Sequence, residues 1–411
     1  MRILYFASVD FYQKPNPSFH LMSTMIHDLL ESGISIEYVG LAMDGVKKHI
    51  PEEFASHKAF HYQLVEFPNT PKNSFAKRYV DGMTYARKAR QLISHEIKDC
   101  DLVFIQSSPT VLYNIKAVRV LDKKKPIVYN IQDMFPGSSI ASGVMPNKLM
   151  QQFFYSLQKI AYKNSDMMVV ISEDMKTKLM EQGVPEERIR VIVNWFDDTS
   201  VHEVSWEENR FVKKYQMTKD KFYIQYAGTM GYVFDYKMVL QVASLLQPYD
   251  DIEIQMIGEG SQKEAFITEA KDRGLNNIVF LPLEPQNMVS DVYSACSVCF
   301  IPLKKGIIGN SVPSKAGLLM ACKRAIVTTS DNGSDYNNMI NSNGIGYAFS
   351  TDEPEKVAEA ILYMENHPDE LKQMGVAGYE YGHELYSRKN NMKKYLDIIS
   401  IVISNSKKGC S

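Results

Sequence analysis

Residues 307–335, IIGNSVPSKAGLLMACKRAIVTTSDNGSD, combine a turn-rich loop, a short helix and a strand in one stretch. Residues 309–315 read as the loop, 316–322 as two helical turns and 325–330 as a buried strand. A Ser/Gly-rich loop that leads into a helix presents free backbone N–H groups, which suit a phosphate. An ordinary strand-to-helix connection would have the same pattern. The stretch therefore predicts an α/β fold and leaves phosphate binding open.

Length and composition point to an ordinary globular protein of two domains. The chain has 411 residues, of which 45% are hydrophobic and 23% charged, and this length favours two cores over one. The formal net charge of −2 gives no general signal for nucleic-acid binding. We expect no nucleic-acid partner.

The cysteines and the N-terminus indicate a cytoplasmic protein. Cys296 and Cys299 lie in the apolar run YSACSVCFIPL, which favours buried, reduced thiols over a redox or zinc site. The N-terminal MRILYFASVD reads as a strand and lacks the features of a signal peptide. No apolar stretch is long enough to span a bilayer. We expect a cytoplasmic location, with at most peripheral contact at the inner face of the membrane.

The first half alternates strands and helices, which predicts a parallel sheet. Its helices are expected at 20–32, 150–165 and 173–180, and residues 42–80 look less regular. The first loop does not spell GxGxxG, so the dinucleotide fingerprint is absent. The predicted strands are 2–8, 34–41, 101–106, 126–131, 166–172 and 189–193.

Two residues of the first half are candidates for catalysis. Asp133 follows the strand 126–131, and polar residues after buried strands lie on the functional edge of a parallel sheet. The alternative is a turn aspartate before the break at Pro136-Gly137. His20 lies at the first loop-to-helix junction, where it would be either an imidazole at the cleft or a solvent-exposed residue at a helix start.

A basic cluster interleaved with aromatic residues lies at 72–90. It would be either a solvated helix face or a surface for anionic lipid or a lipid-diphosphate acceptor. The residues proposed for acceptor or membrane contact are Lys77, Arg78, Arg87 and Lys88.

The second half repeats the α/β pattern after a boundary placed between residues 196 and 197. Helices are expected at 237–246, 262–273, 288–296 and 355–365, followed by a polar helical region at 369–404. We expect domains at 1–196 and 197–385, with residues 386–411 packing back on the first. The predicted strands are 222–226, 252–257, 278–281, 298–302 and 325–330.

Six motifs in this order resemble the retaining glycosyltransferases of family four, and the resemblance covers most of the chain. The subgroup that acts in capsule and O-antigen synthesis, similar to fucosaminyl-type transferases, shares the Ser-Val-Pro-Ser-Lys and Gly-Ser-Asp turns. The resemblance implies the GT-B arrangement, an α/β fold of two facing Rossmann-like domains with parallel sheets and an interdomain cleft. The motifs are NIQDMFPGS (130–138), VVISEDMKTKLMEQGVPEERIRVIVNWFD (169–197), YAGTMG (226–231), IGEG (257–260), FLPLEP…VYSACSVCFIPL (280–303) and SVPSK…MACKRAIV…GSD (311–335).

The resemblance places the nucleotide-sugar donor on the second domain. The loop 228–231 would approach the β-phosphate closely because glycine has no Cβ. Lys237 lies where the family often has a phosphate-binding lysine, although a solvated lysine at a helix start is the alternative. The implied donor-binding residues are Gly228, Thr229, Met230, Gly231, Lys237, Glu259, Leu283, Ser311, Val312, Pro313, Ser314, Lys315 and Asp335.

The chain departs from the family pattern at two places. Where the family carries two glutamates, the second of which binds the donor ribose, this chain has Asn310 and Leu318. Asp335 or Glu259 could supply the carboxylate instead. The family's His-Asp pair reads Gln132-Asp133.

We therefore expect transfer of a sugar with retention from a nucleotide-diphosphate sugar, with UDP favoured, to a glycan or a polyprenyl-diphosphate-linked acceptor. Asp133 and His20 are the catalytic candidates. No DxD stands where a metal-dependent transferase would use it, so we expect no metal and no cofactor. A second hypothesis is a non-catalytic sugar-nucleotide or polysaccharide-binding relative. A nonhydrolysing sugar-nucleotide epimerase ranks last, because only Asp133 and Glu259 fit its acid–base residues.

Overall fold

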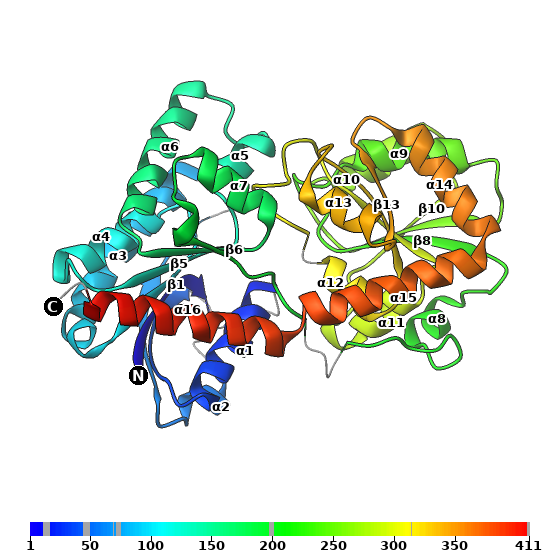
Figure 1. Cartoon of the computed structure of the whole chain (residues 1–411). Helices are drawn as coiled ribbons and strands as arrows, with labels where there is room; N and C mark the ends of the chain where they lie inside the picture. The colour runs from blue at the N-terminus through cyan, green and yellow to red at the C-terminus, as the bar shows by residue number, and fades with distance from the viewer. Residues whose placement is uncertain are drawn as a thin grey trace. The chain divides into compact units, whose positions relative to one another are not determined.

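The computed structural model describes residues 1–10, 17–43, 50–68, 70, 75–196, 201–313 and 315–408. The chain forms two compact units (Figure 1). Unit 1 comprises Met1–Ser138, Met145–Val193 and Asn391–Ser411, and unit 2 comprises Ser139–Val144 and Asn194–Asn390. Each unit is an α/β fold built on its own parallel sheet, which confirms the predicted fold class.

Unit 1 is built on a seven-stranded sheet in the order β3-β2-β1-β4-β5-β6-β7. Every pair of neighbouring strands is parallel. The inner strands are mostly apolar, with few polar residues such as Glu37 and Asn130, because helices cover both faces of such a sheet. The strands are β1 (Arg2–Asp10), β2 (Ser35–Met43), β3 (Phe60–Phe67), β4 (Leu102–Gln106), β5 (Ile127–Ile131), β6 (Met167–Val170) and β7 (Ile189–Val191).

Unit 1 forms regular elements in the region 42–80, which looked less regular in the sequence. The short helix α2 (Glu52–Ala55), the edge strand β3 and the long helix α3 (Phe75–Asp99) all begin within it. The pattern of β3 is weak because an edge strand exposes many of its side chains. The short helix α5 (Gly137–Ala141) begins at the end of a unit 1 segment, and its residues from Ser139 onward are assigned to unit 2. The other helices are α1 (Pro17–Glu31), α2 (Glu52–Ala55), α3 (Phe75–Asp99), α4 (Val111–Leu121), α6 (Lys148–Lys163), α7 (Glu173–Glu181) and the 3-10 turn η1 (Glu186–Arg188).

Unit 2 is built on a six-stranded parallel sheet in the order β10-β9-β8-β11-β12-β13. The stretch 307–335 supplies the helix α12 (Lys315–Ala321) and the strand β12 (Ala325–Ser330), as predicted. The other strands are β8 (Phe222–Ala227), β9 (Ile252–Ile257), β10 (Ile278–Leu281), β11 (Val298–Pro302) and β13 (Gly346–Ser350). The other helices are α8 (Arg210–Tyr215), α9 (Tyr236–Leu246), α10 (Lys263–Asp272), η2 (Gln286–Met288), α11 (Val289–Ser294), α13 (Asp335–Ser342), α14 (Pro354–Asn366) and α15 (Pro368–Leu385).

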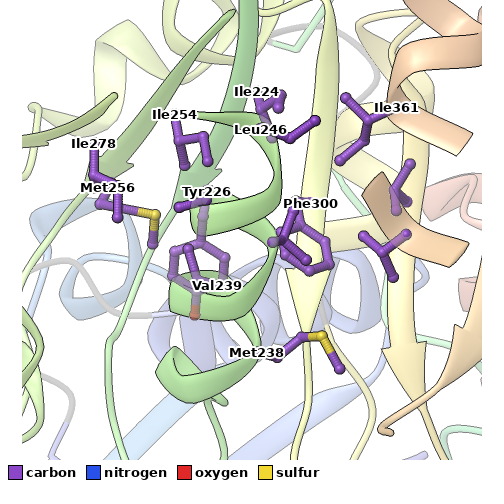
Figure 2. Close-up of a cluster of buried hydrophobic side chains, with 14 of the residues drawn as sticks. Ile224, Tyr226, Met238, Val239, Leu246, Ile254, Met256, Ile278, Phe300 and Ile361 are labelled. Atoms are coloured by element: carbon purple, nitrogen blue, oxygen red, sulfur yellow. The ribbon is translucent and has the colours of Figure 1, made fainter. Parts of the chain in front are cut away.

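The core of unit 2 lies under the helix α9. Figure 2 shows Met238 and Val239 of this helix meeting side chains of the sheet, among them Tyr226 and Phe300. Tyr226 is part of this core, and its hydroxyl donates to the carbonyl of Thr229 at 2.8 Å. The core therefore fixes the C-terminal end of β8 and the loop that follows it.

The C-terminal region forms two helices, α15 and α16 (Arg388–Lys408), where the sequence suggested one region at 369–404. The part of α16 from Asn391 onward belongs to unit 1. There the hydroxyl of Tyr395 donates to Asn130 Oδ1 of β5 at 3.1 Å.

The cysteine prediction is confirmed for the two residues that it concerned, because Cys296 and Cys299 are buried free thiols. Within the described ranges, no helix is both long and apolar enough to cross a membrane. No group of three His, Cys, Asp or Glu side chains suited to a metal ion occurs among these residues.

Candidate nucleotide-diphosphate site

Two glycine loops meet at one edge of the unit 2 sheet. Gly228 follows β8 and Gly258 follows β9, and the carboxyl ends of parallel strands share an edge. Two backbone bonds join the loops, from Gly228 N to Ile257 O at 2.8 Å and from Met230 N to Glu259 O at 2.9 Å. The predicted residues Gly228–Gly231 and Glu259 are therefore brought together.

The loops approach so closely that only glycine fits. A Cβ at Gly258 would collide with the carbonyl oxygen of Gly228, and one at Gly260 would collide with that of Met230. Gly258 also has a φ of +132°, a backbone region that side chains disfavour. The contact leaves a bare backbone surface, which a ligand can approach closely.

Replacing Gly258 by alanine is expected to lower the free energy of unfolding by about 3 kcal/mol, because strain and collision add. The matched control is Gly274→Ala, where φ is +67° but nothing lies within 4 Å. Only the backbone cost of about 1–2 kcal/mol should appear there. Thermal melting compares the two variants, and equal losses would contradict the close approach of the loops.

Lys315, the first residue of α12, reaches the same place. Its Nζ lies 3.4 Å from the centroid of the Tyr226 ring and fills the space that a Cβ of Gly228 would take. Within the described residues, Lys315 Nζ forms no ion pair and no hydrogen bond. Burial lowers the pKa of this ammonium to about 7, with a small opposing effect from the thiol of Cys299. A desolvated cation without an anionic partner is suited to an anionic ligand.

This pKa predicts how donor binding depends on pH. A diphosphate binds the ammonium form, whose share falls as the pH rises above about 7. Affinity for UDP should therefore fall from pH 7 to 9, by up to about tenfold per pH unit. Over the same range the contribution of Lys315 to the free energy of unfolding should rise, because the unfolded chain holds this proton more tightly.

Calorimetric titration of UDP across this pH range measures the effect. Lys315→Arg is the control, because its guanidinium stays charged throughout. An affinity that is independent of pH in the wild type would contradict the shifted pKa or the contact with the diphosphate.

Lys237 is placed differently. It lies on α9, where its Nζ is paired with Glu269 of α10 and lies 4.9 Å from the Tyr236 ring centroid. The hydrogen bond that Lys237 donates to Glu269 raises the pKa of this lysine. Its charge is thus compensated within the protein, whereas that of Lys315 is not.

Glu259 and the loop 306–310 are held by contacts that the sequence did not reveal. Lys263 Nζ donates to Glu259 Oε1 at 2.7 Å and to the carbonyl of Gly258 at 2.9 Å.

Asp331, directly after β12, accepts from the N–H groups of Gly306 at 2.6 Å and Ile308 at 3.1 Å. Asn310 Nδ2 donates to the carbonyl of Gly306 at 2.7 Å. An aspartate after a buried strand was the signal that could have indicated Asp331.

The remaining donor candidates of unit 2 lie on loops around these residues. Ser311, Val312 and Pro313 are half-buried just before α12, and Ser314 lies outside the described residues. Leu283 is exposed in the loop after β10. Asp335 is exposed in the first turn of α13, which Ser334 caps.

The candidates of unit 1 lie at its own strand ends and on α3. Asp133 is exposed two residues after β5. The strand end beneath it is held by Gln132, whose N–H donates to Ser107 Oγ at 3.1 Å and whose Nε2 donates to Asn130 Oδ1 at 3.3 Å. His20 lies in α1, and its side chain is outside the described part. The four basic candidates on α3, Lys77, Arg78, Arg87 and Lys88, are all exposed.

Comparison with known families and structures covers both halves of the chain. Residues 25–200 match the model for Glycosyltransferase Family 4, and residues 207–381 match the model for Glycosyl transferases group 1. The chain is 24% identical over 350 residues to the probable glycosyltransferase WbjE of Pseudomonas aeruginosa, covering 84% of this chain and 86% of WbjE.

Two further similarities concern one sequence and one solved structure. The putative colanic acid biosynthesis glycosyl transferase WcaI of Escherichia coli K12 is 22% identical over 250 residues, 60% of each chain. The crystal structure of Anabaena HepE in complex with UDP has a TM-score of 0.73 at 13% identity, covering 97% of this chain and 100% of HepE.

Proposed function

Because the chain belongs to the GT-B glycosyltransferases, with a family 4 N-terminal half and a group 1 C-terminal half, we propose that it transfers a sugar from a UDP-sugar with retention. The acceptor is a glycan or a polyprenyl-diphosphate-linked glycan in bacterial surface polysaccharide synthesis, at the cytoplasmic face of the membrane. The observation that carries the donor assignment is Lys315, an unpaired cation beside two bare glycine loops. HepE, a protein of the same fold solved with UDP, and the name of WcaI support the choice of donor and pathway.

The diphosphate of the donor lies against Gly228 and Gly258 and accepts from Lys315. As the bond from the anomeric carbon to the phosphate oxygen breaks, negative charge builds on that oxygen. A fixed ammonium in a partly desolvated place stabilises this charge without reorganisation. In this proposal the protein's own cation meets the charge and no metal ion is required.

The acceptor hydroxyl attacks the anomeric carbon on the face that the phosphate leaves, which gives retention. The new glycosidic bond forms from the acceptor oxygen, and its proton passes to the departing phosphate. Asp133 orients the acceptor and steadies the positive charge on the sugar ring, and His20 is the second catalytic candidate. The donor ribose is bound by the carboxylate of Asp335 or Glu259, because Leu318 stands where the family has its ribose-binding glutamate.

A thermal-shift screen with UDP-, dTDP- and GDP-sugars tests the donor. A donor present at a hundredfold its dissociation constant should stabilise the chain by about 2.7 kcal/mol. We expect this shift with UDP-sugars. If none of the nucleotide sugars raises the melting temperature of the chain, the proposal is contradicted.

A second candidate is a non-catalytic sugar-nucleotide-binding relative, which Gln132 and Leu318 favour because they stand where the family has catalytic and ribose-binding residues. Release of UDP from the donor that binds, measured with and without acceptor glycans, separates the two. Binding without any release of UDP would favour the second candidate.

A further inference from the structure

The helix α6 presents apolar side chains to solvent. Leu149 is 78% exposed, Phe153 is 57% exposed and Ile160 is 40% exposed. Their spacing of four and seven residues places them along one side of a helix. A stripe of large apolar residues on the outer side of a helix marks an interaction surface.

The buried side of the same helix shows that this orientation is fixed. Phe154 and Tyr162 pack inward together with Gln158, which is 3% exposed. In the part of the chain that the structure describes, the Oε1 atom of Gln158 has no hydrogen-bond partner. The helix therefore buries a polar amide while Leu149 and Phe153 face out, two features that depart from the usual pattern of a surface helix.

The charged residues on the exposed side of α6 are all positive. Lys148, Lys159 and Lys163 are exposed and lie along one edge of the apolar stripe, and residues 134–165 contain no Asp or Glu. Within the described residues, none of the three lysines forms an ion pair. We call Leu149, Phe153 and Ile160 with these three lysines the α6 face.

The helix α3 contacts the buried side of α6 and carries further exposed basic and apolar residues. Tyr79 of α3 lies 5.0 Å from Phe154 of α6, between ring centroids, and α4 packs against both helices (Figure 1). Beside Tyr79, Lys77 and Arg78 are exposed, and Val80 is 58% exposed. Asp81, the nearest acid on α3, accepts a hydrogen bond from Thr70 at 2.6 Å.

A row of aromatic rings leads from this face to the Asp133 loop. Phe153 lies 5.4 Å from Phe154, and Phe154 lies 5.1 Å from Phe135, between ring centroids. Phe135 is two residues beyond Asp133. The exposed apolar stripe and the predicted acceptor loop are therefore neighbours within unit 1.

We propose that the α6 face docks on a bilayer surface rich in anionic lipid. Apolar residues that enter the interface beside a row of lysines are typical of an interfacial helix, and each lysine adds attraction to anionic headgroups. A second copy of the chain is a poorer occupant, because lysines would then face lysines. Docking would bring a membrane-held acceptor to the Asp133 loop, a consequence that rests on the proposed function.

Vesicle flotation of the full chain without any nucleotide sugar tests the docking. Vesicles of phosphatidylcholine alone are compared with vesicles in which about a third of the lipid is phosphatidylglycerol. We expect binding to the anionic vesicles only, weakened as salt screens the lysines.

Two variants dissect the α6 face. Lys148→Gln, Lys159→Gln and Lys163→Gln together should lower the partition coefficient on the order of a hundredfold, since each lysine contributes about fivefold. Leu149→Ser with Phe153→Ser should lower it about tenfold or more. The controls are Lys213→Gln, Lys271→Gln and Lys372→Gln together, and Leu245→Ser, all exposed positions of unit 2, which should bind like the wild type.

Binding to neither vesicle, equal binding to both, or unchanged binding of the α6 variants would overturn the proposal. So would a dimer, seen by light scattering without lipid, that the Leu149→Ser, Phe153→Ser variant abolishes. UDP binding of the same variants, measured without vesicles, keeps the two hypotheses apart. Lost docking with intact UDP binding leaves the transferase proposal standing.

Discussion

Replacing Lys315 by alanine is expected to lower kcat/KM for UDP-sugar by about 10²–10³-fold. The ammonium of Lys315 is held over Tyr226 with no anionic partner in the described residues, whereas the nearby Lys263 is paired with Glu259. Lys315 therefore supplies the uncompensated positive charge that meets the developing phosphate charge. The fold should be retained, because Lys315 lies in the first turn of α12 and its side chain forms no ion pair with the described residues. UDP release coupled to transfer measures the loss.

Two lysines serve as controls for Lys315→Ala. Lys305→Ala removes an exposed lysine from the loop after β11 and should change kcat/KM by less than about threefold. Lys237→Ala breaks the pair with Glu269 and should lower thermal stability slightly, as expected for an exposed ion pair, while kcat/KM changes little. A large loss of activity in Lys237→Ala beside a small one in Lys315→Ala would reverse the assignment.

Replacing Asp133 by asparagine is expected to lower kcat for transfer by about 10²–10⁴-fold, while affinity for UDP stays unchanged. The substitution keeps the shape of the side chain and removes its negative charge. It therefore removes the stabilisation of positive charge on the sugar ring and the orientation of the acceptor hydroxyl. The backbone around it is fixed by the contacts of Gln132 with Ser107 and Asn130.

Glu181→Gln, at an exposed position on α7, is the matched control for Asp133→Asn, because it removes one carboxylate from the same unit. Single-turnover transfer and calorimetric UDP binding are measured for both variants. Near wild-type transfer by Asp133→Asn, or a parallel loss of UDP binding, would show that Asp133 does not act on the acceptor side.

The fold was largely predictable because its strands are buried on both faces. An apolar run such as β12, bounded by turn residues, leaves few alternatives. Among the elements that were missed, β3 is an edge strand and α3 is a long helix of mainly polar composition. Their stability comes from packing against neighbours, which the local pattern does not record.

The candidate site was predictable in its glycines and less so in its charges. The sequence shows that Gly228 and Gly258 follow strands, and their close approach follows from strand order. Whether a lysine is paired depends on a residue far along the chain, such as Glu269 for Lys237. The sequence therefore named Lys237 and Lys315 alike, and only the tertiary structure distinguishes them.

The most direct test is a crystal structure of the chain with UDP. We predict that the diphosphate lies against Gly228 and Gly258 with an oxygen within hydrogen-bond distance of Lys315 Nζ, while the Lys237–Glu269 pair remains intact. A diphosphate bound to Lys237 with that pair broken, or bound away from both glycine loops, would contradict the central claim.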